Sequence, residues 1–154
     1  MFDARLEELG LRLPGPFLPH DPLDAVVVHR GTARTSGCLP RDADGRFVTG
    51  LLGRDVTTAD GAACADLCAQ NAVSVLRAAL GSLDVIERVL TVTVFIACVA
   101  DFVEQPAVAD GASALLVRLF GDHGRHSRSA IGVAALPRGA PVEIEVTVAL
   151  RAER

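Results

Sequence analysis

Two side chains near the C-terminal end of the chain have the chemistry of a small-molecule site, Arg128 and Glu143. An arginine guanidinium presents a planar fork that can bind a carboxylate through two parallel hydrogen bonds. A partly buried glutamate with a raised pKa can accept a proton from water. Each residue also has a plainer interpretation: Arg128 as a surface ion-pair partner, and Glu143, with Glu145, as part of a solvated strand face.

The four cysteines do not form a recognisable metal or redox motif. They contain no CxxC pair and no Cys/His cluster with zinc-finger spacing, so free thiols are predicted. Two of them are four residues apart on a predicted helix and would share one face, where a metal could bind. No histidine lies near that pair, and we expect both thiols to pack inward with no metal bound. The residues are Cys38, Cys64, Cys68 and Cys98.

Composition predicts one cytoplasmic domain. The chain has 154 residues, of which 50% are hydrophobic, enough for a single core. The net charge of −4, the lack of Trp and Tyr and the absence of long basic runs argue against nucleic acid as a partner. The N-terminus lacks the pattern of a signal peptide. The apolar run at residues 89–100 is too short to span a bilayer, so no membrane partner is expected.

The chain is predicted to start with an N-terminal arm at residues 1–24. Residues 3–10 have the pattern of a short amphipathic helix, and the prolines that follow favour an extended segment on the surface. A β-hairpin is predicted from residues 25–29 and 33–38. Residues 42–45 (Asp-Ala-Asp-Gly) then have the composition of a tight turn.

The rest of the chain alternates between helix and strand. The longest helix is expected from Thr57 or Thr58 to Gly81, followed by a β-branched strand at residues 85–98. A second helix is expected with Asp101 as its cap, with Pro106 in its early part, ending at Gly121.

Two strands are predicted to complete the domain, after a loop at residues 123–126. Its two histidines could tune or gate a cleft or be simply exposed. The strands cover residues 128–135 and 142–150, and the second alternates apolar residues with Glu143, Glu145 and Thr147. The order β-β-α-β-α-β-β predicts an α/β (α+β) domain at residues 25–151, a sheet with two helices on one face. Its other face is expected to be partly polar.

The last two strands also carry the motif that makes the sequence specific. An Arg-Ser strand that runs to a Leu-Pro turn is followed by Val-Glu-Ile-Glu, and this combination resembles the Rid (reactive intermediate deaminase, YjgF-like) family, also labelled endoribonuclease L-PSP. The resemblance extends over about residues 25–150. Its elements are residues 128–137, residues 142–145, Thr35-Ser36-Gly37, Asn71, Thr93-Val94-Phe95 and Asp101-Phe102.

The resemblance implies a chorismate-mutase-like fold and a barrel-cored homotrimer with ligand clefts between subunits. It also implies hydrolysis of enamines and imines, such as 2-aminoacrylate, to 2-keto acids and ammonia without a cofactor. Arg128 would bind the substrate carboxylate and Glu143 would activate water. The backbone of Ala130 would contact the substrate nitrogen, and Ser36, Gly37 and Cys38 would complete the substrate-binding residues.

Three departures from the family pattern leave other functions open. Cys38 replaces a common glutamine, Ala130 replaces a common cysteine, and the chain lacks the tyrosine that faces the arginine across the subunit boundary. A non-catalytic trimer that binds or senses a small keto acid is therefore a second hypothesis, and an endoribonuclease is a third. The N-terminal arm is expected to lie over the cleft or on a neighbouring subunit.

Overall fold

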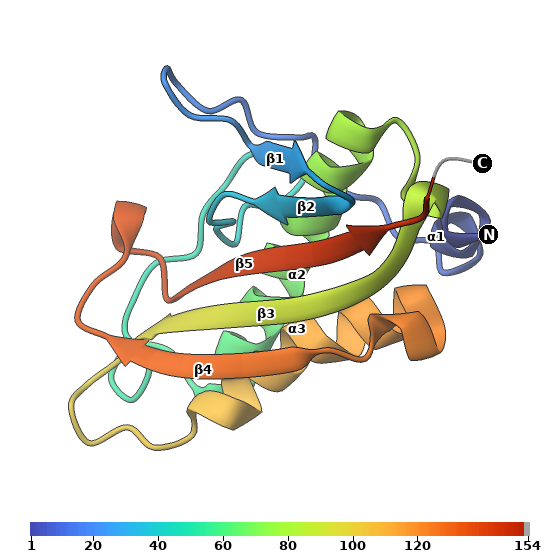
Figure 1. Cartoon of the computed structure of the whole chain (residues 1–154). Coiled ribbons are helices and arrows are strands. Elements are labelled where there is room, and N and C mark those ends of the chain that lie inside the picture. Colours follow the sequence, from blue (N-terminus) through green and yellow to red (C-terminus); the bar gives the residue numbers. More distant parts are fainter. Residues whose placement is uncertain (153–154) are drawn as a thin grey trace.

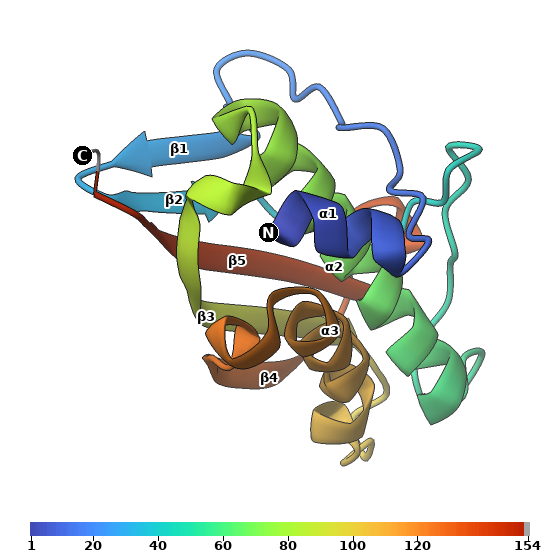
Figure 2. The same ribbon diagram turned by 90° about the vertical axis from the view of Figure 1, so that its right-hand side faces the viewer.

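The fold is a five-stranded sheet with its helices on one face (Figure 1, Figure 2). A computed structural model describes residues 1–152. The sheet order is β1-β2-β5-β3-β4, with β4 parallel to β3 and the other neighbours antiparallel. The elements are α1 (Phe2–Glu8), β1 (Val26–His29), β2 (Thr32–Thr35), α2 (Thr58–Leu80), η1 (Leu83–Val85), β3 (Ile86–Ala97), α3 (Gln105–Phe120), η2 (Gly121–Gly124), β4 (Ser127–Val133), η3 (Pro137–Gly139) and β5 (Val142–Leu150).

Strand alternation separates the two faces of the sheet. On β3 and β5, one set of paired residues is fully buried beneath the helices: Val92 with Val146, Val94 with Ile144, and Ile96 with Val142. The residues between them, including Phe95 opposite Glu143, point to the face without helices. The predicted α+β fold and its partly polar second face are thus confirmed.

The long helix α2 has the ends that its sequence predicts. The Thr57 side-chain oxygen accepts a hydrogen bond from the Asp60 backbone N–H at 3.1 Å, which satisfies one of the free donors of the first turn. Gly81 ends the helix with a φ of 77°, a left-handed conformation that glycine adopts without strain. None of the helices in residues 1–152 is long and apolar enough to cross a membrane.

The start of α3 and the segment after it differ from the sequence prediction. Asp101 does not cap α3, which begins only at Gln105 and has Glu104 at its N-cap position without a side-chain cap. Pro106 occupies the first turn, where its missing N–H costs no helical hydrogen bond. The predicted loop at residues 123–126 is also partly wrong, because η2 extends the chain as a 3₁₀ turn through Gly124.

The first helix of the N-terminal arm packs on the same core. Phe2 and Leu6 of α1 are buried, and the Phe2 ring meets the Phe120 ring edge-on with centroids 4.9 Å apart. Asp3 accepts hydrogen bonds from the Arg77 side chain at 2.8 Å and the Leu83 backbone N–H at 3.0 Å. These contacts tie the beginning of the chain to the far ends of α2 and α3.

The close approach of α2 and α3 depends on a glycine and predicts the effect of a substitution. A Cβ at Gly111 of α3 would overlap with the backbone carbonyl of Ala62 on α2. Gly111→Ala should therefore force the helices apart and lower the free energy of unfolding by about 1–3 kcal/mol. Urea unfolding at fixed protein concentration measures this change. Gly15→Ala is the control, because a Cβ there meets nothing within 4 Å; equal stability of the two variants would contradict the packing argument.

Candidate functional site

Glu143 lies at the wall of a hollow of about 380 Å³ on the N-terminal side of β5, which we call the Glu143 hollow. Its walls come from the N-terminal arm, the loop after β2, helix α2 and the turn before β5. The lining residues are Phe17, Leu18, Pro19, His20, Leu23, Ser36, Gly37, Leu39, Arg41, Phe47, Asn71, Pro137, Arg138 and Glu143. The structure thus brings Glu143 together with Ser36 and Gly37 at one hollow, and the substrate-binding role that the family resemblance implies for them stays a prediction.

Gly37 holds the backbone directly against the Glu143 carboxylate. A Cβ at Gly37 would overlap with Oε1 of Glu143, so only glycine leaves room for the acid in this position. The next residue fixes the register: the Cys38 backbone N–H donates to the Ile144 carbonyl at 2.8 Å, and the Cys38 carbonyl accepts a hydrogen bond from the Ile144 N–H at 3.0 Å. The Ser36 hydroxyl donates to the Asp24 carbonyl at 2.7 Å and so ties the hollow to the arm.

The environment of Glu143 raises the pKa of its carboxyl. Partial burial is the larger cause, because it removes water that would stabilise the charged form, and the nearby negative charge of Glu145 adds to it. Glu145 is itself paired with Arg34 at 2.8 Å. A raised pKa makes the ionised carboxylate a stronger proton acceptor near neutral pH, which suits a group that activates water.

The thiol of Cys38 faces the core and is not available to a ligand. The residue is fully buried, and burial raises the pKa of its thiol to about 12. The backbone N–H and carbonyl of Cys38 are both hydrogen-bonded to Ile144, so this residue anchors the loop after β2 to β5 next to Glu143. Cys64 and Cys68 are also buried and free. Within residues 1–152, no group of three His, Cys, Asp or Glu side chains is placed to hold a metal ion.

Arg128 lies on β4 and points to the helix-covered face of the sheet. Its Nη1 donates to Asp110 Oδ1 at 2.9 Å and to the Ser113 hydroxyl at 3.0 Å, and its Nη2 donates to the Pro106 carbonyl at 3.3 Å. The side chain is 22% exposed, so the guanidinium is held against α3 but still reaches the surface. The Ser113 hydroxyl is also within hydrogen-bonding distance of Nε2 of His126, at 3.0 Å, so the histidine is linked to the arginine through this serine.

The backbone of Ala130 faces the free edge of the sheet. The Cys98 N–H donates to the Val133 carbonyl at 3.2 Å, so Val133 directs its backbone toward β3. Because backbone groups in a parallel ladder alternate between the two sides of a strand, those of Ala130 and Arg128 point the other way. Strand β4 is at the end of the sheet order, and these groups are therefore open to a ligand or another chain.

Within one chain, Arg128 and Glu143 do not meet. Arg128 pairs with Val92, which faces the helices, whereas Glu143 pairs with Phe95, which faces the opposite side. The strands β4 and β5 are separated by β3, so their backbones are about 10 Å apart. The predicted site residues form two groups: Ser36, Gly37 and Glu143 at the hollow, and Arg128 with Ala130 at the edge.

The sequence prediction missed several residues of the Glu143 hollow. Arg138 lines it from the turn before β5, and the arm contributes Phe17, Leu18, Pro19, His20 and Leu23. The Arg138 guanidinium lies over the Phe47 ring at 4.7 Å, and its backbone has the unusual φ of 59°. The proline-rich character of the arm was the available signal, since it indicates an extended chain that follows the surface.

This arrangement belongs to a known family. The family model described as "YjgF/chorismate_mutase-like, putative endoribonuclease" matches residues 3–146, nearly the whole chain. The protein belongs to this YjgF family. The resemblance of the motifs at residues 128–145 is thereby confirmed, as is the fold it implies.

Several known proteins are similar to this chain over almost their entire length. Protein TCP17 of Trypanosoma cruzi is 42% identical over 148 residues, 96% of this chain and 92% of that protein. The crystal structure of Atu1372 from Agrobacterium tumefaciens, of unknown function, has a TM-score of 0.88 at 40% identity, covering 97% and 94% of the two chains. The YjgF gene product of E. coli has a TM-score of 0.62 at 23% identity, covering 89% and 94%, and shows the same fold.

The raised pKa of Glu143 predicts a pH dependence of stability. An acid whose pKa is higher in the folded state favours the fold when protonated and disfavours it as the pH rises above its ordinary pKa of 4.5. Glu143→Gln, which mimics the protonated acid, should therefore be as stable as wild type at about pH 4 and more stable at about pH 7.5. Urea unfolding at both pH values measures the difference. A Glu87→Gln control, at an exposed position of β3, should show no such trend; a matching trend there would contradict the assignment.

Proposed function

We propose that the protein hydrolyses reactive 2-imino acids and enamines, such as 2-aminoacrylate, to 2-keto acids and ammonia, as a cytoplasmic homotrimer. The observation that carries the proposal is the half-buried Glu143 carboxyl with a raised pKa at the wall of a hollow. A group of this kind is suited to take a proton from water at neutral pH. Arg128, on an accessible strand edge, supplies the cation that a 2-imino acid needs for its carboxylate.

The reaction follows from these two groups. Arg128 binds the substrate carboxylate, which takes the place of the exposed Asp110 carboxylate beside the guanidinium. The substrate reacts as the iminium ion, whose nitrogen already carries the extra proton. Glu143 accepts a proton from water as the water oxygen bonds to the iminium carbon, and the electron pair of the C=N π bond moves to nitrogen, which gives a neutral carbinolamine. Glu143 then returns its proton to that nitrogen, the C–N bond breaks with its electron pair leaving on ammonia, and the hydroxyl oxygen forms the C=O bond as its proton passes to the Glu143 carboxylate and on to the released ammonia. An enamine first takes a proton from solvent on its terminal carbon to give the iminium ion.

A site between two subunits is the arrangement that fits the orientation of the two residues. Because Arg128 and Glu143 face opposite sides of one sheet, a single ligand can contact both when they come from neighbouring copies. The helix-free face carries Thr93, Phe95 and Glu145, a mixture of polar and apolar groups that suits a subunit interface better than a core. In this arrangement the Ala130 backbone, at the open edge of β4, would contact the substrate nitrogen.

A non-catalytic trimer that binds a small keto acid is the second candidate. Two observations favour it: the chain contains no tyrosine, and the Arg128 guanidinium is already engaged by Asp110 and Ser113. In this case a keto acid would bind through Arg128, and no imino acid would be turned over.

An endoribonuclease has the least physical support, although the YjgF family description includes that activity. A similar Shewanella oneidensis crystal structure is described as a putative endoribonuclease, with a TM-score of 0.92 at 28% identity over 97% and 99% of the two chains. The net charge here is −4 and aromatic residues make up 4% of the sequence, so contacts to phosphates and stacked bases are scarce. An RNA-binding assay over a salt series separates this candidate: binding that weakens with salt would support it, and no binding at any salt concentration would dispose of it.

Ammonia release tests the hydrolase proposal. Imino acids generated in situ by an amino-acid oxidase, and 2-aminoacrylate generated by a dehydratase, should release ammonia faster with wild-type protein than without it. Arg128→Ala should lower kcat/KM by about 10- to 100-fold, the effect of losing a hydrogen bond to a charged group. Arg118→Ala, in the last turn of α3, is the matched control and should retain full activity. If wild type releases no ammonia from any substrate but binds keto acids through Arg128, the binding trimer replaces the hydrolase.

A further inference from the structure

Arg128 is joined to His126 through a single hydroxyl group, that of Ser113. The Nη1 group of Arg128 lies 3.0 Å from Oγ of Ser113, and Nε2 of His126 lies 3.0 Å from the same oxygen. The other ring nitrogen of His126, Nδ1, is 2.6 Å from the Gly124 carbonyl. These contacts link β4, α3 and η2, and we call them the Arg128–Ser113–His126 network.

The chemistry of the groups fixes the direction of each hydrogen bond in this network. A guanidinium has only donors, so the Ser113 oxygen accepts from Arg128. A backbone carbonyl can only accept, so Nδ1 of His126 carries a hydrogen and donates it to Gly124. In a neutral imidazole the other nitrogen is then an acceptor, and the Ser113 hydroxyl donates to Nε2. The network is therefore complete when His126 is neutral.

The Gly124 carbonyl that holds His126 is fixed by close packing on α3. Gly124 is buried, and a Cβ at this position would overlap with the backbone carbonyl of Leu116. The carbonyl of the next residue, Arg125, accepts a hydrogen bond from the Arg88 side chain of β3 at 3.2 Å. The half-buried His126 thus follows two anchored backbone groups.

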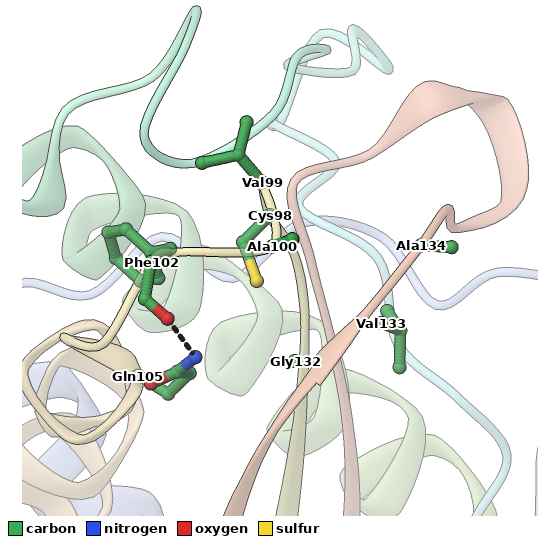
Figure 3. A pocket seen from close by; sticks show the side chains of 8 residues that line it. All are labelled: Cys98, Val99, Ala100, Phe102, Gln105, Gly132, Val133 and Ala134. Atoms are coloured by element: carbon green, nitrogen blue, oxygen red, sulfur yellow. Dashed lines mark hydrogen bonds between the residues drawn. The ribbon is translucent and has the colours of Figure 1, made fainter.

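The second amino group of Arg128 is held by the start of α3. Its Nη2 donates to the Pro106 carbonyl at 3.3 Å. Figure 3 shows the residue before this proline, Gln105, whose amide donates to the Phe102 carbonyl at 2.7 Å and so holds the start of the helix in place. This half of the guanidinium depends on the backbone and not on a titratable side chain.

Ser113 is the contact of Nη1 that a bound ligand would leave in place. The Asp110 side chain is 71% exposed, and a ligand carboxylate would displace it. A serine hydroxyl within a helix has an alternative acceptor in the carbonyl four residues earlier, here that of Ala109. Nε2 of His126 draws the hydroxyl hydrogen away from that alternative, so the Ser113 oxygen keeps facing Arg128.

We propose that neutral His126 is a positioning residue for Arg128: by accepting the Ser113 hydrogen, it holds the guanidinium in the orientation that binds a ligand carboxylate. This inference rests on the proposed function, in which Arg128 binds that carboxylate. A proton on Nε2 would turn the acceptor into a donor, leave the Ser113 hydrogen without its partner and place a positive charge two hydrogen bonds from the guanidinium. Because histidine side chains ordinarily change charge between about pH 5 and 8, ligand binding should weaken on acidification.

The charged groups on the elements around His126 support this direction. They are Asp110 of α3, Arg128 of β4, Arg88 of β3, and Asp122, His123 and Arg125 in and directly after η2. The two acids are already paired, Asp110 with Arg128 at 2.9 Å and Asp122 with Arg125 at 3.6 Å. A proton on His126 would therefore face the arginines without either of these acids free to pair with it.

Binding of pyruvate at two pH values tests the inference. In titration calorimetry, wild type should bind pyruvate about 3- to 10-fold more weakly at about pH 5.5 than at about pH 7.5, the effect of one lost hydrogen bond. The side chain of His126→Gln can accept the Ser113 hydrogen but takes up no proton. This variant should bind as wild type does at about pH 7.5 and lose the pH dependence. His123→Gln, at an exposed position of η2, is the matched control and should keep it.

A double-mutant cycle shows whether His126 acts through Ser113. At about pH 7.5, Ser113→Ala and His126→Ala should each weaken pyruvate binding by about 3- to 10-fold. The double variant should bind within about 2-fold of Ser113→Ala, because a residue that acts through another adds nothing once the other is gone. Effects that add in full, or a wild-type affinity that rises on acidification, would contradict the inference.

Nitrogen NMR of isotope-labelled histidine gives a test on the wild-type protein, independent of how the variants fold. At about pH 7.5, His126 should carry its hydrogen on Nδ1 and none on Nε2. The opposite tautomer would overturn the inference, because Nε2 could not then accept from Ser113.

The outcomes separate this inference from the proposed function. If the His126 variants bind pyruvate as wild type does at both pH values, while Arg128→Ala abolishes binding and ammonia release persists in wild type, His126 is not a positioning residue and the hydrolase proposal stands. If wild type binds no pyruvate at either pH and releases no ammonia, the proposed function fails and the inference that rests on it fails as well.

Discussion

The alternation of side chains along the strands is the constraint on which the rest of this protein depends. It buries Val92, Val94 and Ile96 of β3 beneath α2 and α3 and leaves the opposite face open. The same alternation turns Glu143 toward the open face and Arg128 toward the helices. Neither residue can be moved to the other face without shifting a whole strand by one residue, which would expose the core. The fold therefore keeps the two proposed site residues, Arg128 and Glu143, on opposite faces of the sheet of one chain.

Each of the two proposed site residues is held by a different kind of contact. Glu143 is held by shape, since Gly37 leaves room for its carboxylate and the backbone pair between Cys38 and Ile144 sets the register beside it. Partial burial there raises the pKa of the Glu143 carboxyl, so its carboxylate is a stronger base. Arg128 is held by charge and hydrogen bonds from α3, through Asp110 and Ser113. An exposed ion pair of this type is weak in water, so a ligand carboxylate can take the place of Asp110.

The sequence is most informative where a local rule decides the structure. Three predictions of this kind are confirmed, because each depends on residues close together in the sequence: the helix cap at Thr57, the helix end at Gly81 and the alternation along Val142–Leu150. The motif at residues 128–145 is sufficient to indicate the YjgF family. The predicted start of α3 was wrong. Asp101 belongs to a residue type that often caps helices, but the helix begins only at Gln105, directly before Pro106.

Contacts between distant segments are the part that the sequence could not show. Phe17 and Glu143 line the same hollow although they are more than 100 positions apart, and the prolines of the arm indicate an extended surface segment without showing which residues it contacts. The face on which Arg128 lies was also hidden, because Ser127–Val133 is an edge strand with no apolar alternation. The partners of Arg128 come from α3, whose rotation is set by packing against α2 at Gly111.

Subunit complementation tests most directly whether Arg128 and Glu143 act on one ligand from neighbouring copies. Arg128→Ala and Glu143→Gln chains, each with little activity alone, are unfolded together, refolded at equal amounts and assayed for ammonia release. Random mixed trimers would contain interfaces that combine an intact Glu143 with an intact Arg128, so about a quarter of the wild-type activity should return. No recovery in mixed trimers, with activity regained by a wild-type sample treated in the same way, would contradict a site shared between subunits.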